Sequence, residues 1–127
     1  MMMMEKTNGG IKVDGYYRWI TVNNVRYETD IIIHTDGTVS ERDETASMDF
    51  KGDYFHVPLS ERELHFLSEE RPEKVIIGSG FKGMLPLTPN AKVILREYGY
   101  VARITTDAIQ LVNDERSKFV AIMHIKC

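Results

Sequence analysis

The first half of the chain alternates short runs of β-branched and aromatic residues with turn signals, which favours antiparallel strands. Residues 16–22 and 25–29 flank Asn23-Asn24, a pair that tolerates the positive φ angles of a tight hairpin. The apolar run Ile31-Ile32-Ile33-His34 is followed by the turn signal Asp36-Gly37, which predicts a second hairpin with a buried first strand. Residues 42–52 are polar and aperiodic, and we expect them to form a mobile surface loop.

The pattern changes in the second half of the chain. Ser60-Glu61-Arg62-Glu63 has the form of a capping box, and Leu59 with Leu64 would complete a hydrophobic staple. These residues predict a helix that begins at Ser60. It must end by Pro72, because proline lacks the backbone N–H and its ring opposes continuation.

Strands and helices then alternate to the end of the sequence. Residues 75–77 predict a strand, and Thr88-Pro89 supplies an N-cap followed by proline at the first helical position. The helix that follows has one apolar face and a glycine stop, formed by Ala91, Ile94, Leu95, Tyr98 and Gly99. Residues 101–104 predict the next strand, and Thr105 or Thr106 caps a helix that reaches about Arg116. Residues 119–125 form an apolar run suited to a central strand buried on both faces.

This order of elements predicts an α/β fold: a three-layer sandwich with a central mixed β-sheet, helices on both faces, and N-terminal β-hairpins. We expect residues 1–10 to be a disordered tail and residues 11–127 to form a single α/β domain. A chain of 127 residues can bury a hydrophobic core large enough to fold without disulfides or bound metals.

Composition narrows the classes of partner. The formal net charge is −3, so the protein lacks the excess of positive charge that attracts the phosphate backbone of nucleic acids, and we expect no nucleic-acid partner. No apolar run has the length that crosses a bilayer, and we expect no membrane partner. The single cysteine, Cys127, together with the absence of a secretory or organellar leader pattern, indicates a reducing, cytoplasmic location.

The strand 74–77 leads into Gly78-Ser79-Gly80-Phe81-Lys82-Gly83, a literal G-x-G-x-x-G sequence. In a dinucleotide-binding fold the third glycine already belongs to the following helix, whereas here Met84-Leu85-Pro86-Leu87 intervenes. We therefore expect no nicotinamide or flavin cofactor. Two alternatives stay open: the glycines allow a strained exit from a central strand, or loop amides, Ser79 and Lys82 bind a small anion.

A second candidate segment is Thr105-Thr106-Asp107. If strands 75–77 and 101–104 are parallel neighbours, this turn and the glycine loop lie at the same carboxyl edge of the sheet, where open α/β folds bind ligands. The alternative is that a threonine only caps the helix and Asp107 only complements its dipole. The candidate ligand-binding residues are thus Gly78, Ser79, Gly80, Lys82, Thr105, Thr106 and Asp107.

The sequence predicts neither a metal site nor a catalytic residue. The four histidines are scattered, and only His124 and Cys127 have a spacing typical of metal ligands, without a second pair. We expect no nucleophilic role for Cys127, because an adjacent terminal carboxylate disfavours its thiolate.

Three segments in order resemble a known family of small proteins: Ile76-Ile77-Gly78-Ser79-Gly80, then Thr105 to Ile109 with Asn113, and the closing Val120 to Cys127. The family includes the mitochondrial complex I assembly factors and the adipogenesis-associated domain proteins. The resemblance covers roughly residues 30–127. It implies a compact three-layer α/β fold with a mixed sheet, and for most members no established activity.

Two functional hypotheses follow. The leading one is a non-catalytic protein-interaction or assembly-factor-like module, with a protein partner or a second copy of the chain. The alternative is a protein, or an enzyme, that binds a small anionic ligand at the Gly78–Gly83 loop.

Overall fold

The computed structural model describes residues 10–127, so the predicted tail lies outside the described residues except for Gly10. The elements in chain order are β1 (Val13–Tyr16), β2 (Trp19–Val22), β3 (Val25–Tyr27), β4 (Ile31–Ile33), β5 (Val39–Glu41), η1 (Glu44–Phe50), α1 (Lys51–Tyr54), η2 (Glu61–Glu63), α2 (Leu67–Glu70), β6 (Lys74–Ser79), α3 (Pro89–Arg96), β7 (Tyr100–Arg103), α4 (Thr105–Asp114) and β8 (Phe119–His124), where η marks a 3₁₀ helix.

A five-stranded mixed sheet with the order β5-β4-β8-β6-β7 forms the centre of the molecule. Strand β6 runs parallel to both β7 and β8, whereas β4 is antiparallel to β8 and β5. The carboxyl ends of β6, β7 and β8 therefore share one edge of the sheet. The predicted α/β class with a mixed sheet is confirmed.

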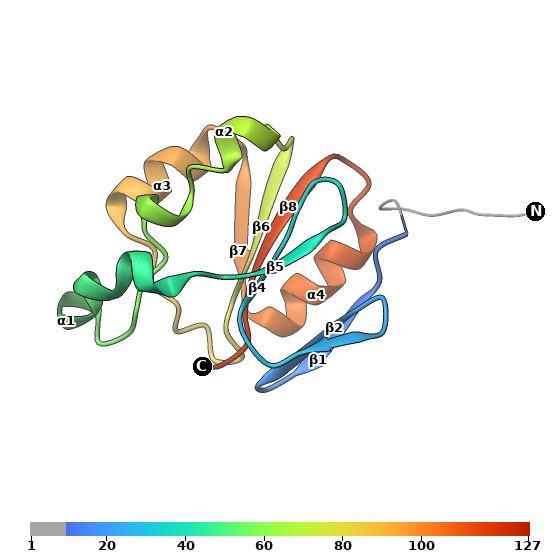
Figure 1. Cartoon of the computed structure of the whole chain (residues 1–127), viewed down its shortest axis with the longest axis horizontal. Helices are drawn as coiled ribbons and strands as arrows, with labels where there is room; N and C mark the ends of the chain where they lie inside the picture. Colours follow the sequence, from blue (N-terminus) through green and yellow to red (C-terminus); the bar gives the residue numbers. More distant parts are fainter. Residues whose placement is uncertain (1–9) are drawn as a thin grey trace, which may run out of the picture.

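Helices cover both faces of this sheet, with α2 and α3 on one side and α4 on the other (Figure 1). Alternate residues of β8 supply the two cores. Phe119, Ala121 and Met123 join the α4 side, whereas Val120 and Ile122 join the side of α3. All five are buried, which confirms the predicted central strand with no solvent-facing side.

The N-terminal strands form a separate antiparallel sheet, β1-β2-β3, that packs beyond α4 (Figure 1). Asn23 and Asn24 connect β2 to β3 with φ angles of 50° and 71°, as the predicted hairpin requires. The Asn113 side chain joins α4 to β1: its Oδ1 accepts from Val13 N at 2.7 Å, and its Nδ2 donates to Val13 O at 2.8 Å. The sequence analysis did not separate β1 from β2, because their turn contains Arg18 at φ 75° without a glycine or asparagine.

Helix α3 has the predicted ends. The Thr88 hydroxyl accepts from Ala91 N at 3.2 Å, and Pro89 is the first helical residue. Gly99 has a φ of +68° after the helix. Ala91 and Leu95 are fully buried, so the apolar stripe is the face that contacts the sheet.

The segment 42–52 differs from its prediction. It contains η1 and the start of α1, and both Arg42 and Ser47 are buried. Most of the segment is at the surface as predicted, but the prediction of a loop was wrong, and the two buried polar groups have charged and hydroxyl partners that the local sequence does not reveal.

The helix predicted from Ser60 is also incorrect in form. It is replaced by the 3₁₀ turn η2 and the four-residue helix α2. The Ser60 hydroxyl accepts from Arg62 N rather than from the third residue, and the Glu63 carboxylate turns to Arg42 and Ser47 instead of back to Ser60. The capping box does not form.

The cap predicted for α4 is wrong as well. Ile104 occupies the N-cap position, without a side-chain cap, and Thr105 lies inside the first turn. The Thr105 hydroxyl is engaged elsewhere, as described below. Within residues 10–127, the helices are all too short or too polar to cross a membrane.

Candidate functional site

Thr105 joins the carboxyl ends of the two central parallel strands. Its hydroxyl donates to the backbone oxygen of His124 at 2.6 Å and accepts from Gly80 N at 2.9 Å. The residue is completely buried. The edge that the sequence proposed as a ligand rim is therefore bound together by a side chain from α4.

Gly80 allows the last residues of the chain to pass against the loop. Its φ is +101°, and a Cβ placed there would lie 2.3 Å from the carbonyl carbon of Cys127. Three loop amides bond to the same segment: Phe81 N to Lys126 O at 2.8 Å, and Lys82 N and Met84 N to Cys127 O at 2.9 and 3.1 Å. In this structure, the loop amides that one of the two sequence hypotheses assigned to an anion bond to the chain's own backbone.

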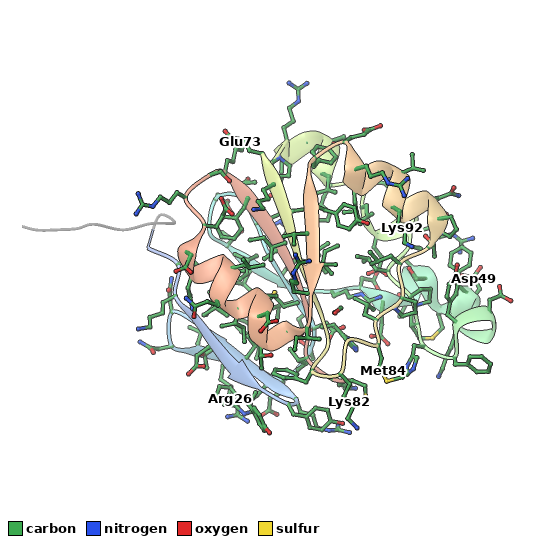
Figure 2. The ribbon with its side chains drawn as sticks, turned by 180° about the vertical axis from the view of Figure 1, so that it is seen from behind. Arg26, Asp49, Glu73, Lys82, Met84 and Lys92 are labelled. Atoms are coloured by element: carbon green, nitrogen blue, oxygen red, sulfur yellow. The ribbon has the colours of Figure 1, made fainter. Side chains whose placement is uncertain are left out.

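The other predicted site residues divide into two groups. Gly78 is buried, with Thr105 Oγ1 3.0 Å from the position of a Cβ, and the Ser79 hydroxyl donates to Arg103 O at 3.0 Å. By contrast, Lys82, Thr106 and Asp107 are exposed, and no hydrogen bond or ion pair joins their side chains to one another in the described part of the chain. Lys82 lies near Met84 at one end of the molecule, far from Glu73 at the opposite end of the strands (Figure 2).

At the same edge of the sheet, Asp30 and His124 form a hydrogen-bonded pair that was not predicted from the sequence. Asp30, immediately before β4, accepts from Nδ1–H of His124 at 2.7 Å through Oδ2 and from the backbone N–H of Ile125 at 2.9 Å through Oδ1. Burial alone would raise the pKa of Asp30. The hydrogen bonds and charges of His124, Ile125 N–H and Arg42 outweigh it and hold the pKa below its ordinary value.

Because a carboxylate only accepts, the bond to Asp30 places a proton on Nδ1 of His124. The other ring nitrogen, Nε2, has no hydrogen-bond partner among residues 10–127. The His124 side chain is 16% exposed and borders two pockets. The bond to Asp30 therefore fixes the tautomer of this ring, in which Nε2 carries the lone pair when the ring is neutral.

Arg42 lies behind this pair with a side chain only 1% exposed. Its guanidinium donates to Asp30 at 3.0 Å, to both oxygens of Glu63 at 2.7 and 2.9 Å, and to Pro58 O at 3.0 Å. Burial would lower the pKa of Arg42, but the bonds and charge of Glu63, then of Asp30, raise it above its ordinary value. The arginine is thus a fixed cation held by two carboxylates.

Two adjoining pockets open at this cluster, with volumes of about 290 and 280 Å³. Both are lined by Arg42, Glu44, His124 and Lys126. The larger one is completed by Lys51, Phe55, His56, Val57 and Leu85. Its ionisable lining contains Glu44 as the single carboxylate beside several basic side chains, whereas four carboxylates, Glu28, Asp30, Glu41 and Glu44, line the smaller pocket.

The sequence analysis noted His124 only for its spacing to Cys127 and assigned Arg42 to a surface loop. A usable signal was present: Asp30 directly precedes a buried strand, and His124 ends another. Their pairing follows from the antiparallel register of β4 and β8, in which Ile31 opposes Met123. In residues 10–127 there is no group of three or more His, Cys, Asp or Glu side chains suited to a metal ion.

Comparison with solved structures supports the fold. The chain resembles a conserved hypothetical protein from Pyrococcus horikoshii, with a TM-score of 0.79, 22% identity, and coverage of 91% of this chain and 99% of that one. It is also similar to a protein named MT938, with a TM-score of 0.75, 28% identity, and coverage of 93% and 100%. A Bordetella pertussis protein described as a Mth938-like domain has a TM-score of 0.56, 18% identity, and coverage of 98% and 92%.

One of these neighbours is described as a conserved hypothetical protein and another as a Mth938-like domain, so the comparison agrees with a small α/β fold without confirming the resemblance to the complex I assembly factors. No family model matches the chain, and no curated protein matches it.

Proposed function

We propose that this protein binds a small anionic ligand at the carboxyl edge of its parallel strands, in the pocket beside His124. The observation that carries the proposal is the set of basic side chains around one cavity: Lys51, His56, His124 and Lys126, with the Arg42 guanidinium behind them. A pocket of about 290 Å³ suits a ligand the size of a phosphorylated or carboxylated metabolite.

The pocket adjoins the glycine loop that sequence reasoning selected. Gly80 lies beside the His124 ring, since a Cβ there would be 2.9 Å from its Cδ2, and Leu85 at the end of the loop lines the cavity. We propose that Gly78, Ser79, Gly80 and Thr105 shape this wall of the site. Lys82, Thr106 and Asp107 would stand at its rim.

Binding is tested by calorimetric titration of the protein with inorganic phosphate and pyrophosphate. A charge-assisted contact contributes about 1.5–3 kcal/mol when sheltered, and less when exposed. We therefore expect Lys126→Ala to weaken binding by about tenfold. The matched control is Lys92→Ala, since Lys92 is exposed on α3 away from this edge (Figure 2) and its loss should leave binding unchanged.

A third variant, Lys82→Ala, separates the pocket from the loop. Weakening by Lys126→Ala alone supports the pocket, whereas weakening by Lys82→Ala alone returns the ligand to the Gly78–Gly83 loop. Equal affinity in all variants, or no binding at millimolar anion, would reject the proposal.

A second candidate function is the protein-interaction module of the family resemblance, and an aromatic surface favours it. The Phe81 ring lies 5.8 Å from that of Tyr16 and 6.5 Å from that of Tyr17, and the Arg18 guanidinium is 5.2 Å from the Tyr17 ring. Tyr16 is 65% exposed. Exposed tyrosine and arginine side chains are typical of interface centres.

The simplest partner for this surface is a second copy of the chain. Sedimentation equilibrium of the parent protein and of Tyr16→Ser tests that hypothesis. A concentration-dependent dimer that Tyr16→Ser weakens would support it, and a monomer at all concentrations would remove self-association from consideration.

A further inference from the structure

A separate cluster lies at the β4–β5 hairpin, on the face of the sheet covered by α2. His34 follows β4, Ser40 lies in β5, and Glu70 is the last residue of α2. The Ser40 hydroxyl is 2.7 Å from Nε2 of His34, and the Glu70 carboxylate is 2.5 Å from Nδ1 of the same ring. One imidazole thus joins a hydroxyl to a carboxylate.

The positions of the ring and hydroxyl protons follow from which of these groups can donate a hydrogen bond and which can only accept one. The Glu70 carboxylate only accepts, so Nδ1 of His34 carries the proton and donates it. In the neutral ring Nε2 then has the lone pair, and the Ser40 hydroxyl donates to it. This is the protonation pattern in which an imidazole acts as a base toward a hydroxyl.

The carboxylate is itself held in place. Its second oxygen accepts from the backbone N–H of Thr35 at 2.9 Å and from the Thr35 hydroxyl at 3.1 Å. The Phe66 ring contacts the His34 ring edge to face, with centroids 5.4 Å apart. The side chains of His34 and Glu70 are only 20% and 22% exposed, so the ring has little freedom to turn.

Ser40 opens to a cavity of about 310 Å³. Apolar lining beside the serine comes from Ile32, Ala46 and Phe66. The polar lining consists of Arg62 and His65 together with the carboxylates of Glu41, Asp43 and Glu63. Glu41 follows Ser40 on the strand at the edge of the sheet. Two backbone bonds between these strands, His34 N to Thr38 O and Arg42 N to Asp30 O, show which residue pairs are hydrogen-bonded. Because such pairs alternate along an antiparallel ladder, the Glu41 N–H points away from β4, toward the open edge of the sheet.

We propose that Ser40, His34 and Glu70 form a nucleophile–base–carboxylate triad that hydrolyses small carboxylic esters. Ser40 Oγ bonds to the ester carbonyl carbon while its proton passes to Nε2 of His34. The imidazolium is stabilised by Glu70 and gives that proton to the leaving alcohol oxygen as the carbon–oxygen bond breaks. Water then attacks the acyl-Ser40 through the same base and releases the acid.

The Glu41 N–H belongs to the residue after the nucleophile and points away from β4, so in this proposal it donates to the developing oxyanion. The cavity volume of about 310 Å³ leaves room for a short acyl chain against Ile32, Ala46 and Phe66. This site is distinct from the anion pocket at the carboxyl edge, so the two proposals stand or fall separately.

An alkyl fluorophosphonate tests the nucleophile, because Ser40 Oγ would attack its phosphorus, displace fluoride and keep a mass adduct. Intact-mass spectrometry with peptide mapping follows the rate of labelling. We expect one adduct at Ser40, and labelling at least about 100-fold slower in Ser40→Ala and His34→Gln. Ser68→Ala is the matched control, because Ser68 is an exposed serine bonded only to His65 O.

Glu70 acts through His34 and is a positioning residue, so its test needs a second observable. In Glu70→Gln the amide can donate to Nδ1, which would move the ring proton to Nε2. We expect ¹⁵N NMR of the His34 ring to report that tautomer together with the slowed labelling. Labelling of Ser40 no faster than of Ser68, or an unchanged rate in Ser40→Ala or Glu70→Gln, would overturn the triad.

Discussion

Residues 42–70 and residues 74–124 differ in their secondary structure and in the polar groups that they bury. The second segment consists of strands and helices whose apolar faces meet at the sheet, and its helix α3 begins and ends at local signals. The first contains 3₁₀ turns and two four-residue helices. It contributes Leu59, Leu64 and Leu67 to the apolar core, and it also buries Arg42 with the carboxylates of Asp30 and Glu63 and the hydroxyls of Ser47 and Ser60.

The irregular segment therefore combines apolar packing with a buried network of polar groups. The Ser47 hydroxyl donates to Glu63 at 2.6 Å, so the Ser60 hydroxyl donates to Ser47 and accepts from Arg62 N. No buried side-chain nitrogen or oxygen within residues 10–127 lacks a partner. Such a network is satisfied as a unit, and loss of one member leaves the others buried without compensation.

The largest expected effect is on Arg42. Arg42→Met keeps the volume but leaves the carboxylates of Asp30 and Glu63 buried without their cation, which should cost about 3–5 kcal/mol of unfolding free energy. Urea unfolding measures the loss. The control is Arg62→Met, because the ion pair of Arg62 with Asp49 is exposed to solvent and its loss should lower the urea midpoint far less.

Neutralising the two carboxylates sharpens this test. Addition of Asp30→Asn and Glu63→Gln to Arg42→Met should recover part of the stability, because the uncompensated charges are then absent. Equal losses for Arg42→Met and Arg62→Met would mean that the buried cluster does not anchor the segment.

A smaller effect is expected in the regular segment at Gly80. Gly80→Val forces a β-branched residue to a φ of +101° and sets its Cβ against the backbone of Cys127. The strain should cost about 1–3 kcal/mol and free the amides of Phe81 and Lys82 from their acceptors. Hydrogen exchange of these two amides, together with urea midpoints, measures both consequences.

Gly52→Val is the matched control, because a Cβ at Gly52 meets nothing within 4 Å. It should leave the midpoint nearly unchanged. If both valine variants had the same urea midpoint, the close approach between the glycine loop and the last residues of the chain would not contribute to stability.

The smallest expected losses of stability come from removing one capping hydroxyl in each segment. Ser60→Ala and Thr88→Ala each remove a hydroxyl that accepts a backbone N–H, and each should cost about 1 kcal/mol. Their couplings to Ser47→Ala should differ. Ser60 contacts Ser47, so that double-mutant cycle should depart from additivity by at least about 0.5 kcal/mol, whereas Thr88 with Ser47 should add. Additivity in both cycles would argue against a connected hydroxyl network.

The sequence by itself determined the elements whose signals are local. Asn23-Asn24 predicted a hairpin because both residues accept positive φ, and Thr88-Pro89 with Gly99 predicted both ends of α3. The unbroken apolar run of β8 predicted a central strand, since only a strand covered on both faces can bury every side chain. These signals predicted the α/β class and the carboxyl edge at which two strands end.

The tertiary structure alone decided where the polar side chains of that edge and of the middle segment point. Glu63 could cap its own turn or pair with Arg42, and Thr105 could cap α4 or join β6 to β8. Local sequence favoured the first choice in each case. The second prevails because a buried charge or backbone group without a partner costs more than a surface cap contributes. His34, Ser40 and Glu70 likewise meet only through the hairpin register and the position of α2, contacts that no periodicity in the sequence encodes.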